Sequence, residues 1–374
     1  MRRSVGLVHD YLLVMRGAER TFAAIAECWP DAPIYTLLYD EEGTNGALDG
    51  RAVHPSYLQR LCVRQRGFRR LLPLFPRAAE GLPVQSHDLV ISSTSAFAHG
   101  VRPAPEALHV AYCYTPFRYA WHERDPMLQH APRPLRPAVG QTLDRVRAWD
   151  LQASRRVSHY IAISELTRQR IADCYGREAS VVHPPVEVER FSVGEPEDFF
   201  LVVCELVTHK RVANALEAAR RAEKPIAVVG GGPELGRLRR EYGSSARFVG
   251  RLDDAALADL YPRARALVMP NVEEFGIAAV EAQAAGRPVL AADAGGARET
   301  VIEGHTGVRV PVDDVNALAE AMSGVDWEGF DSARVREHAF RFSTDAFRKR
   351  FMEEVGRVTG GTGARPAGRA SGGE

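Results

Sequence analysis

The feature that most constrains the fold is a regular alternation of short apolar runs with segments of helical periodicity. In the first half of the chain the apolar runs are "SVGLV", "APIYTLLY", "DLVIS", "LHVAYC" and "YIAIS". Helix-like segments such as "GAERTFAAIAECW" and "ELTRQRIADCYG" lie between them. Short buried strands that alternate with helices are typical of βα units, so this part predicts a mostly parallel sheet.

A second alternating series follows a break in this pattern. The segment "VVHPPVEVERFSVGEPEDF" is rich in Pro and Glu and has no helical period, which predicts a linker near residues 184–197. The apolar runs after it are "FFLVV", "PIAVVG", "ARFVG", "RALVMP", "RPVLAA" and "GVRV". The two series predict an α/β chain with two Rossmann-like βαβ domains that face each other across a cleft, where ligands of such proteins commonly bind.

The expected domain boundaries follow from this pattern. We expect an N-terminal domain over residues 1–186 and a C-terminal domain over residues 187–342. The segment "TDAFRKRFMEEVGRV" predicts a helix near residues 343–357 that rejoins the N-terminal domain. Residues 358–374 are rich in Gly and poor in apolar residues, which predicts a disordered tail.

Composition excludes several classes of protein. The formal net charge of +0 argues against broad nucleic-acid binding, which needs a basic surface. The 5 cysteines are scattered without CxxC spacing, so we expect no disulfide framework or zinc site and a reducing, cytoplasmic location. No segment approaches the roughly 18 apolar residues of a membrane span, and the N-terminus is interpreted as a strand rather than a signal peptide.

The segment "PNVEEFGIAAVEAQAAGRPVL" carries the main candidate for a binding site. Glu273 and Glu274 are predicted in a loop after a buried strand, and Glu281 in the helix that begins near Ile277. Ligands of parallel α/β domains lie at the carboxyl ends of strands, and carboxylates accept hydrogen bonds from vicinal sugar hydroxyls. Free backbone N–H groups at the helix start would add donors. The alternative is that all three carboxylates are solvated surface charges.

Other segments repeat the strand–loop–helix arrangement. In "VVCELVTHKRVANALEAAR", Lys210 and Arg211 fall at a helix start, where cations are disfavoured unless an anion lies nearby. The glycines of "VVGGGPELGRL" and "AADAGGARETVIEGHTGVRV" allow close approach to a phosphate or ribose, although tight βα turns also use glycine. The segment "VHDYLLVMRGAERTF" predicts a loop before a helix near Gly17, either a ligand-closing loop or a simple connection.

Together these segments resemble the family-4 retaining glycosyltransferases, which have the GT-B fold. "EEFGIAAVE" is similar to the E-x7-E element of that family, with Glu273 and Glu281 as its two acids. "GAER", "LVTHKRV", "VVGGGPEL" and "AGGARETVIEGHTGVRV" are supporting matches. "VISSTSAFAHGVR", "YCYTPFRYAW" and "VVHPPVEVERF" resemble the subgroup that builds mannose-containing surface polysaccharides, and the resemblance extends to about residue 355.

The resemblance implies roles for particular residues. Glu273 would hold hydroxyls of the donor sugar, Glu281 would bind the ribose, and Lys210 would neutralise the diphosphate. The catalytic residues would be Glu273, Lys210 and Tyr114. The donor-binding residues would be Gly17, Glu205, Arg211, Gly231, Arg251, Leu252, Glu274, Phe275, Gly276, Ile277 and Glu281.

Two positions depart from the family pattern. Glu205 stands where the family often has an Arg that clasps the diphosphate, and Tyr114 stands where the subgroup often has a His that contacts the donor sugar. His109 lies five residues before Tyr114, so strand alternation places the two on opposite faces. These departures keep open a second interpretation, a nucleotide-sugar-binding protein without turnover.

The function implied by the resemblance is retaining transfer of a hexose, with mannose favoured, from a nucleoside-diphosphate sugar. The acceptor would be a glycan, a lipid-linked glycan or a small molecule, and GDP-, UDP- and dTDP-sugars remain open as donors. No metal or other cofactor is expected, since no DxD-type acidic pair is placed to hold a divalent ion. "RQRGFRRLLPLFPRAAEG", from Arg64, fits either a basic face on anionic lipid or a solvated helix.

Overall fold

The computed structural model describes residues 3–61 and 67–360. The chain divides into two compact units. The first comprises Met1–Ile163, Thr167–Val182 and the chain from Arg348 onward, and the second comprises Ser164–Leu166 and His183–Phe347.

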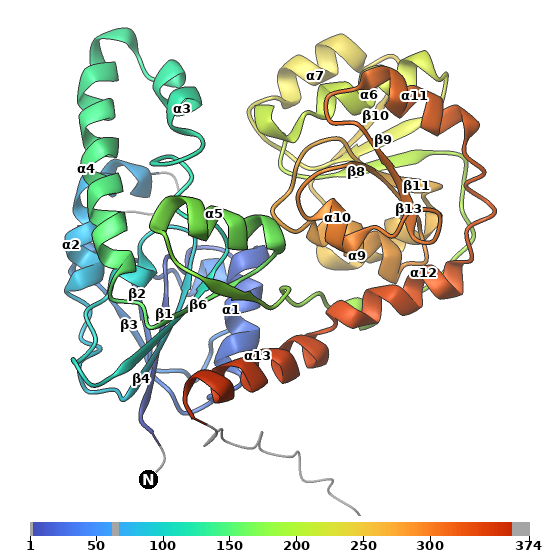
Figure 1. Ribbon diagram of the computed structural model, residues 1–374. Coiled ribbons are helices and arrows are strands. Elements are labelled where there is room, and N and C mark those ends of the chain that lie inside the picture. The colour runs from blue at the N-terminus through green and yellow to red at the C-terminus, as the bar shows by residue number, and fades with distance from the viewer. Residues whose placement is uncertain (1–2, 62–66, 361–374) are drawn as a thin grey trace, which may run out of the picture. The chain divides into compact units, whose positions relative to one another are not determined.

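Within the described residues, the first unit is built on a seven-stranded sheet whose recorded strand pairs are all parallel (Figure 1). The strand order is β3-β2-β1-β4-β5-β6-β7. The strands are β1 (Val5–His9), β2 (Ile34–Thr36), β3 (Val53–Pro55), β4 (Leu89–Thr94), β5 (Leu108–Cys113), β6 (His159–Ala162) and β7 (Ala179–Val181). The central strands β4 and β5 are almost wholly buried, as expected of a parallel sheet covered on both faces.

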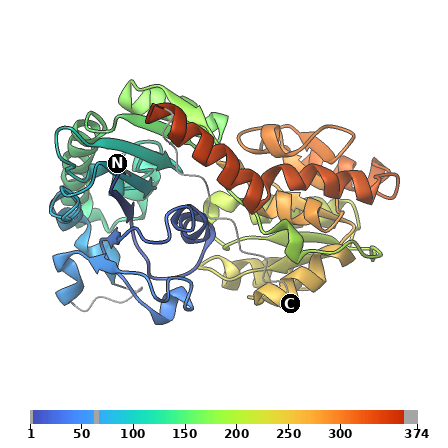
Figure 2. The ribbon, with the colours of Figure 1, turned by 90° about the horizontal axis from the view of Figure 1, so that it is seen from below.

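Helices connect these strands. They are α1 (Gly17–Ala26), α2 (Phe75–Glu80), α3 (Arg124–His130), α4 (Arg136–Ser154), α5 (Glu165–Tyr175) and α13 (Thr344–Val358). The last helix returns to the first unit (Figures 1 and 2). There Phe351 packs edge-on against Trp29 and Tyr112. Chain segments more than 200 residues apart therefore share one core.

The second unit contains a six-stranded sheet, whose recorded strand pairs are again all parallel, in the order β10-β9-β8-β11-β12-β13. Its strands are β8 (Phe200–Val203), β9 (Ile226–Val229), β10 (Arg247–Gly250), β11 (Ala266–Met269), β12 (Val289–Ala292) and β13 (Gly307–Val310). Its helices are α6 (Val212–Arg221), α7 (Leu235–Tyr242), α8 (Asp254–Leu260), α9 (Ile277–Ala284), α10 (Ala297–Thr300), α11 (Val315–Gly324) and α12 (Ser332–Ala339). Short 3₁₀ turns that matter below are η6 (Val188–Arg190), η7 (Thr208–Lys210) and η8 (Tyr261–Arg263).

The two parallel sheets confirm the predicted α/β fold class. Every apolar run taken as a strand overlaps a strand of the structure, and "LHVAYC" and "GVRV" match β5 and β13 end to end. The short edge strands β3 and β7 and the long helix α4 were not predicted. The disordered tail was predicted over residues 358–374, of which residues 361–374 lie outside the described part of the chain.

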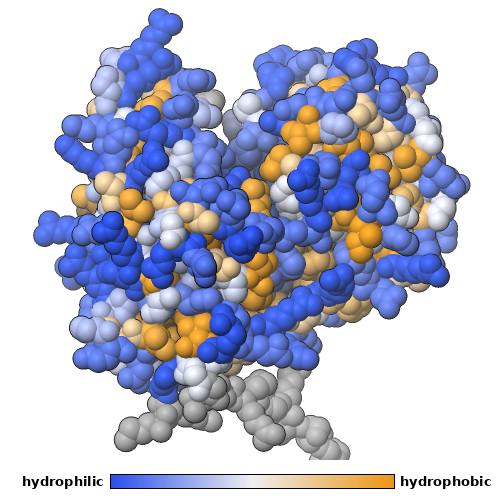
Figure 3. Space-filling model, viewed as in Figure 1, coloured by the Kyte–Doolittle hydropathy of each residue, from blue (hydrophilic) through white to orange (hydrophobic). Residues whose placement is uncertain are grey.

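The surface and the helices bear on the expected relation to membranes. Hydrophilic residues cover most of the face that Figure 3 shows, with apolar residues in smaller patches. In the part of the chain that the structure describes, no helix combines the length and apolar character needed to cross a bilayer. The basic segment from Arg64 begins within residues 62–66, which lie outside the described residues.

Candidate functional site

The candidate site is built on the loop between β11 and α9. All four residues of β11 are buried. The loop follows β11 in the chain, so it lies at the carboxyl edge of the second sheet. Gly276 ends the loop with a φ of 95°, a left-handed conformation that favours glycine. A Cβ atom there would also lie 3.2 Å from Met269 Sδ. The loop therefore turns sharply into α9, whose first N–H groups have no acceptor within the helix.

An ion pair joins this loop to η7, the turn that follows the neighbouring strand β8. Lys210 Nζ lies 2.5 Å from Glu273 Oε1 and 2.7 Å from Glu273 Oε2. The Lys210 and Glu273 side chains are 20% and 18% exposed, and Asn271 Nδ2 donates a third hydrogen bond to Oε1 at 3.0 Å. Because β8 and β11 are neighbours in the sheet, their carboxyl ends bring these residues together. The sequence predicted both residues at this edge but not their contact.

The turn between β12 and α10 packs against the same loop. The N–H of Gly296 donates to the carbonyl of Glu273 at 2.9 Å. A Cβ atom at Gly296 would lie 2.1 Å from the carbonyl oxygen of Phe275, so only glycine fits there without moving the loop. The segment that looked like an ordinary turn in the sequence is thus packed against the backbone that carries Glu273.

Glu281, the second acid of the pair, has different partners from Glu273. It lies within α9, and its side chain is 15% exposed. Arg190 Nη2 donates to Glu281 Oε1 at 3.2 Å, and the Tyr261 hydroxyl donates to Oε2 at 2.8 Å. The two acids therefore sit in separate electrostatic environments, one against a lysine and the other against an arginine and a tyrosine.

A histidine and a glutamate that sequence reasoning did not assign also support the loop. Phe275 is 3% exposed, and its ring stacks on His183 with 5.5 Å between ring centroids. His183 Nε2 lies 2.8 Å from Glu299 Oε2, and the carboxylate of Glu299 accepts two hydrogen bonds from the Glu165 N–H. His183 lies in "VVHPPVEVERF", a segment that the sequence had marked as the start of a linker and for its resemblance to the polysaccharide subgroup.

The glycine turn after β9 lies beside the ends of β8 and β10. The N–H of Leu206 donates to the carbonyl of Gly231 at 3.0 Å, which ties this turn to the loop after β8. A Cβ atom at Gly231 would lie 3.0 Å from Arg251 Nε, so the Arg251 side chain packs on this glycine. Glu205 is exposed in the same loop and Leu252 is half-buried. These residues share one sheet edge because β8, β9 and β10 are neighbours.

Arg211 and Lys210 form ion pairs with different residues. Arg211 precedes α6 in a left-handed conformation, with a φ of 51°, and its guanidinium forms an ion pair with Asp313. The anions expected near this helix start are therefore found within the protein, as Glu273 for Lys210 and Asp313 for Arg211. Glu274, the other acid of the loop, is half-buried.

In the first unit, Tyr114 is tied to the start of α1. Its hydroxyl donates to the carbonyl of Ala18 at 2.8 Å and lies 2.8 Å from Ser93 Oγ. Ser93 Oγ also lies 3.1 Å from His9 Nδ1, and burial raises the pKa of Tyr114 and lowers that of His9 to about 4. Gly17, the first residue of α1, immediately precedes Ala18. This network holds the turn that carries Gly17.

His109 belongs to a different network from Tyr114. His109 Nε2 lies 2.8 Å from Ser92 Oγ, whereas Tyr114 bonds to Ser93. Ser92 and Ser93 are successive residues of β4, whose side chains alternate between the faces of the sheet. His109 and Tyr114 therefore contact side chains on opposite faces of the sheet.

Over residues 3–61 and 67–360 no group of three or more His, Cys, Asp or Glu side chains is arranged to hold a metal ion.

Comparison with known proteins finds a family similarity within the second unit. Residues 186–325 match the model of the family described as glycosyl transferases group 1. This span holds both acids of the E-x7-E element, Lys210 and the glycine turn. The match confirms the resemblance to family-4 glycosyltransferases that the sequence motifs indicated.

Named relatives agree with this assignment. The chain is 37% identical over 194 residues to D-inositol 3-phosphate glycosyltransferase 2 of Catenulispora acidiphila. This match covers 43% of this chain and 45% of that protein. It is 33% identical over 183 residues to phosphatidyl-myo-inositol mannosyltransferase of Mycolicibacterium smegmatis, covering 44% of this chain and 47% of that protein. The matched regions span about half the length of these relatives.

Solved structures show the fold over nearly the whole chain. HepE of Anabaena, solved in complex with UDP and glucose, is similar with a TM-score of 0.70 at 17% identity, covering 95% of this chain and 99% of that chain. Sucrose-phosphate synthase of Thermosynechococcus elongatus is similar with a TM-score of 0.72 at 16% identity, covering 96% and 100%. Both have the GT-B fold, so the predicted fold is confirmed.

Proposed function

We propose that this protein is a glycosyltransferase that moves a hexose, with mannose favoured, from a nucleoside-diphosphate sugar to a glycan, lipid-linked or small-molecule acceptor. The observation that carries the proposal is the Lys210–Glu273 pair at the carboxyl edge of a glycosyltransferase group 1 domain. A cation and a carboxylate stand there beside the first turn of α9, and the glycine turn after β9 lies along the same edge.

Each part of this edge suits one part of a sugar nucleotide. Lys210 supplies a positive charge for the diphosphate, and helix N-termini and glycine N–H groups add donors. Glu273 accepts hydroxyls of the sugar, since a carboxylate oxygen offers two lone pairs. When the diphosphate arrives, Lys210 can exchange one anion for another, which leaves Glu273 available to the sugar. The leaving group is then stabilised by protein donors, and no metal is required.

Retention at the anomeric carbon is part of the proposal. In a front-face attack the departing phosphate takes the acceptor proton, so no protein nucleophile is needed and Glu273 acts by position and charge. The transition state carries oxocarbenium character, as in other glycosyl chemistry.

Two sets of similar proteins favour different sugar donors. Relatives include a phosphatidyl-myo-inositol mannosyltransferase and a mannosyltransferase named as GDP-mannose-dependent, both from Mycolicibacterium smegmatis, which supports GDP-mannose. HepE was solved with UDP-glucose, which supports a UDP-sugar instead. Arg251 beside Gly231 and the neighbouring Leu252 are the candidates to edge the base.

The second candidate function is a nucleotide-sugar-binding protein without turnover. Glu205 is exposed in the loop where the family often has a cation, and the Tyr114 hydroxyl is occupied by Ser93 and Ala18. These two positions favour this alternative, because neither supplies the positive charge that the family places there.

Cytoplasmic location and peripheral membrane contact belong to the same proposal. Relatives that act on phosphatidylinositol-linked acceptors support a lipid-linked acceptor. Near the basic segment from Arg64, the described residues include exposed Leu61 and Leu74. Flotation with anionic vesicles tests the contact. Binding that Arg70→Glu weakens supports it, and no binding by the parent protein contradicts it.

The test of the function combines binding with turnover. GDP-, UDP- and dTDP-sugars are screened by thermal shift, because a ligand of the folded state raises its stability. Release of nucleoside diphosphate is then followed with a panel of glycan and lipid-linked acceptors. Turnover that Glu273→Gln abolishes supports the transferase. Binding without release by the parent protein supports the second candidate, and no binding of any donor contradicts both.

A further inference from the structure

The carboxylate of Glu281 is held from two sides by residues that sequence reasoning did not assign. Arg190 Nη2 donates to Oε1 at 3.2 Å, and the Tyr261 hydroxyl donates to Oε2 at 2.8 Å. The donors come from η6 and η8, and the acceptor from α9. Three separate segments of the second unit therefore meet at one carboxylate.

Tyr261 is a rigid donor. Its side chain is fully buried, and its ring packs edge-on against Phe191 with 5.5 Å between centroids. Burial and the nearby charge of Glu281 raise the pKa of Tyr261 well above its ordinary value, so the hydroxyl keeps its proton and donates at any working pH. The direction of this hydrogen bond is thus fixed.

Arg190 is held in place by further contacts. Its Nη1 lies 3.0 Å from Asp254 Oδ2, and the guanidinium lies over the ring of Phe191, 4.9 Å from its centroid. Its side chain is 20% exposed, as against 53% for Asp254. A guanidinium presents its donors in a fixed plane, so an arginine anchored at one end of the fork orients a carboxylate at the other.

The two donors together fix the plane of the Glu281 carboxylate. A carboxylate accepts at about four lone-pair sites, and a donor on each of its two oxygens sets its orientation. A carboxylate held in one plane can meet two vicinal hydroxyls at once, whereas a freely rotating one loses rotamer entropy on binding them.

We propose that Arg190 and Tyr261 are positioning residues that orient the Glu281 carboxylate to accept the cis-diol of a ribose. This inference rests on the proposed function, since it requires that Glu281 faces the nucleotide. It adds that recognition of the ribose hydroxyls depends on donors behind the carboxylate, which touch no ligand themselves.

The expected signature lies in discrimination between ribose and deoxyribose. A hydrogen bond to a charged group contributes about 1.5–3 kcal/mol, so the parent should bind a ribonucleoside diphosphate about tenfold or more tighter than its 2′-deoxy analogue. Tyr261→Phe keeps the ring but removes the donor, so this ratio should fall to about one to three. The ribose is remote from the reacting carbon, so KM for the donor should rise while kcat changes little.

The experiment is a double-mutant cycle between protein and ligand. Dissociation constants of GDP and 2′-deoxy-GDP, and of UDP and 2′-deoxy-UDP, are measured by calorimetry for the parent, Tyr261→Phe, Arg190→Gln and Arg190→Lys. Tyr242→Phe, a buried tyrosine on α7 of the same unit, is the matched control. Melting temperatures check that each variant is folded. If Arg190→Gln is not folded, Tyr261→Phe alone is enough to test the proposal.

The outcomes separate the inference from the function on which it rests. A ratio that falls in Tyr261→Phe and Arg190→Gln, is partly restored in Arg190→Lys and is unchanged in Tyr242→Phe supports the inference. A parent-like ratio in Tyr261→Phe, with tight binding by the parent, overturns it while leaving the proposed function intact. A parent that binds none of the nucleotides overturns the proposed function, and the inference with it.

Discussion

Lys210 Nζ contacts both carboxylate oxygens of Glu273, at 2.5 and 2.7 Å, although the two residues are 63 positions apart in the sequence. The side chains are about one-fifth exposed, so the attraction is screened less than in a fully solvated pair. In the proposed reaction each residue leaves the other for a part of the sugar nucleotide. The pair therefore keeps both charges in place until the donor binds.

Removing either charge should impair transfer. Glu273→Gln and Lys210→Met should each lower kcat/KM about 100-fold or more, because each removes a charged contact to the reacting donor. The double variant should lose less than the product of the two effects, since the residues act as a unit. The control is Glu234→Gln, which breaks an exposed pair with Arg237 on α7. Steady-state kinetics with the preferred donor measures all four, and parent-like rates in Glu273→Gln would contradict the assignment.

The position of these residues on the fold was predictable from the sequence, because the evidence for it is local. Each run of four to six apolar residues marks a strand, and the polar residues that follow it must lie at the carboxyl edge of a parallel sheet. The helix start predicted near Ile277 was found there. The order of the strands in the sheet was not predictable in this way. β8 pairs with β9, the next strand in the chain, and also with β11, which lies further along it.

The contacts within the site were not predictable, because they depend on which strands become neighbours. Nothing near Glu281 in sequence indicates that Arg190, 91 positions earlier, holds its carboxylate. His183 likewise reaches Glu299 across 116 positions. The edge strands β3 and β7 have only three residues each, which is too short for an alternating pattern to stand out.

Gly296→Ala should disturb the site without touching any charge. An alanine Cβ would lie 2.1 Å from the carbonyl oxygen of Phe275, which is backbone and cannot move aside cheaply. The loop that carries Glu273 must then shift, so kcat/KM should fall about 10-fold or more and the melting temperature should drop. Gly324→Ala is the control, because nothing lies within 4 Å of a Cβ at that last residue of α11. It should be neutral or slightly stabilising. Equal activities in the two variants would show that the loop tolerates displacement.

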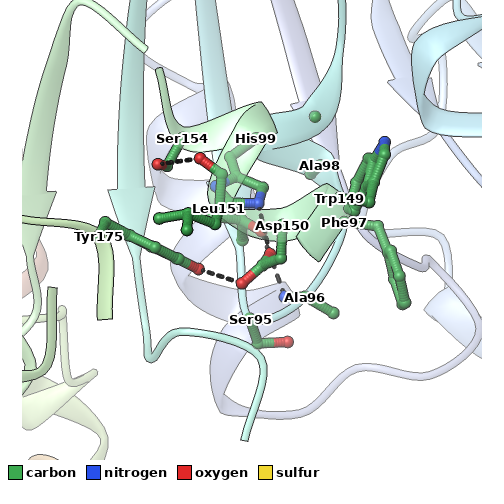
Figure 4. Close-up of polar contacts among 12 residues, drawn as sticks. Ser95, Ala96, Phe97, Ala98, His99, Trp149, Asp150, Leu151, Ser154 and Tyr175 are labelled. Atoms are coloured by element: carbon green, nitrogen blue, oxygen red, sulfur yellow. Dashed lines mark hydrogen bonds and ion pairs between the residues drawn. The ribbon is translucent and has the colours of Figure 1, made fainter. Parts of the chain in front are cut away.

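Asp150→Asn should destabilise the first unit. Asp150 is fully buried on α4 and accepts a hydrogen bond from Trp121 Nε1 at 2.7 Å. It also accepts from the Tyr175 hydroxyl at 2.8 Å and lies 2.8 Å from His99 Nε2 (Figure 4). An amide nitrogen in place of one oxygen faces donors instead of acceptors, which costs about 3 kcal/mol or more.

The control for this substitution lies on the same helix. Asp144 is 59% exposed and bonds to Arg124, so Asp144→Asn should cost less than about 1 kcal/mol. Urea unfolding followed by tryptophan fluorescence compares the two variants. An Asp150→Asn protein as stable as Asp144→Asn would mean that the buried network contributes little to the stability of the first unit.

His109 should make the first unit lose stability in mild acid. Burial lowers the pKa of His109 to about 3, and the nearby His99 and Arg156 act in the same direction. The unfolded chain binds a proton near pH 6.5, so only the unfolded state gains one as the pH falls from about 6.5 toward 3. The contribution of the neutral His109 imidazole to the free energy of unfolding is thus fully present above pH 6.5 and is lost progressively below it. Between pH 7.5 and 5 this one group should remove about 2 kcal/mol.

His109→Gln should remove that part of the pH dependence. Gln bears no titrating proton and can still bond to Ser92 Oγ, 2.8 Å from His109 Nε2 in the parent. Urea unfolding at pH 7.5, 6 and 5 measures the slope through tryptophan fluorescence, to which the first unit contributes Trp29, Trp121 and Trp149. His305→Gln, at an exposed position of the second unit, should keep the parent's slope. A His109→Gln protein that loses stability with acid as steeply as the parent would mean that His109 binds its proton equally well in the folded state. A fully buried imidazole near the Arg156 guanidinium should not do so.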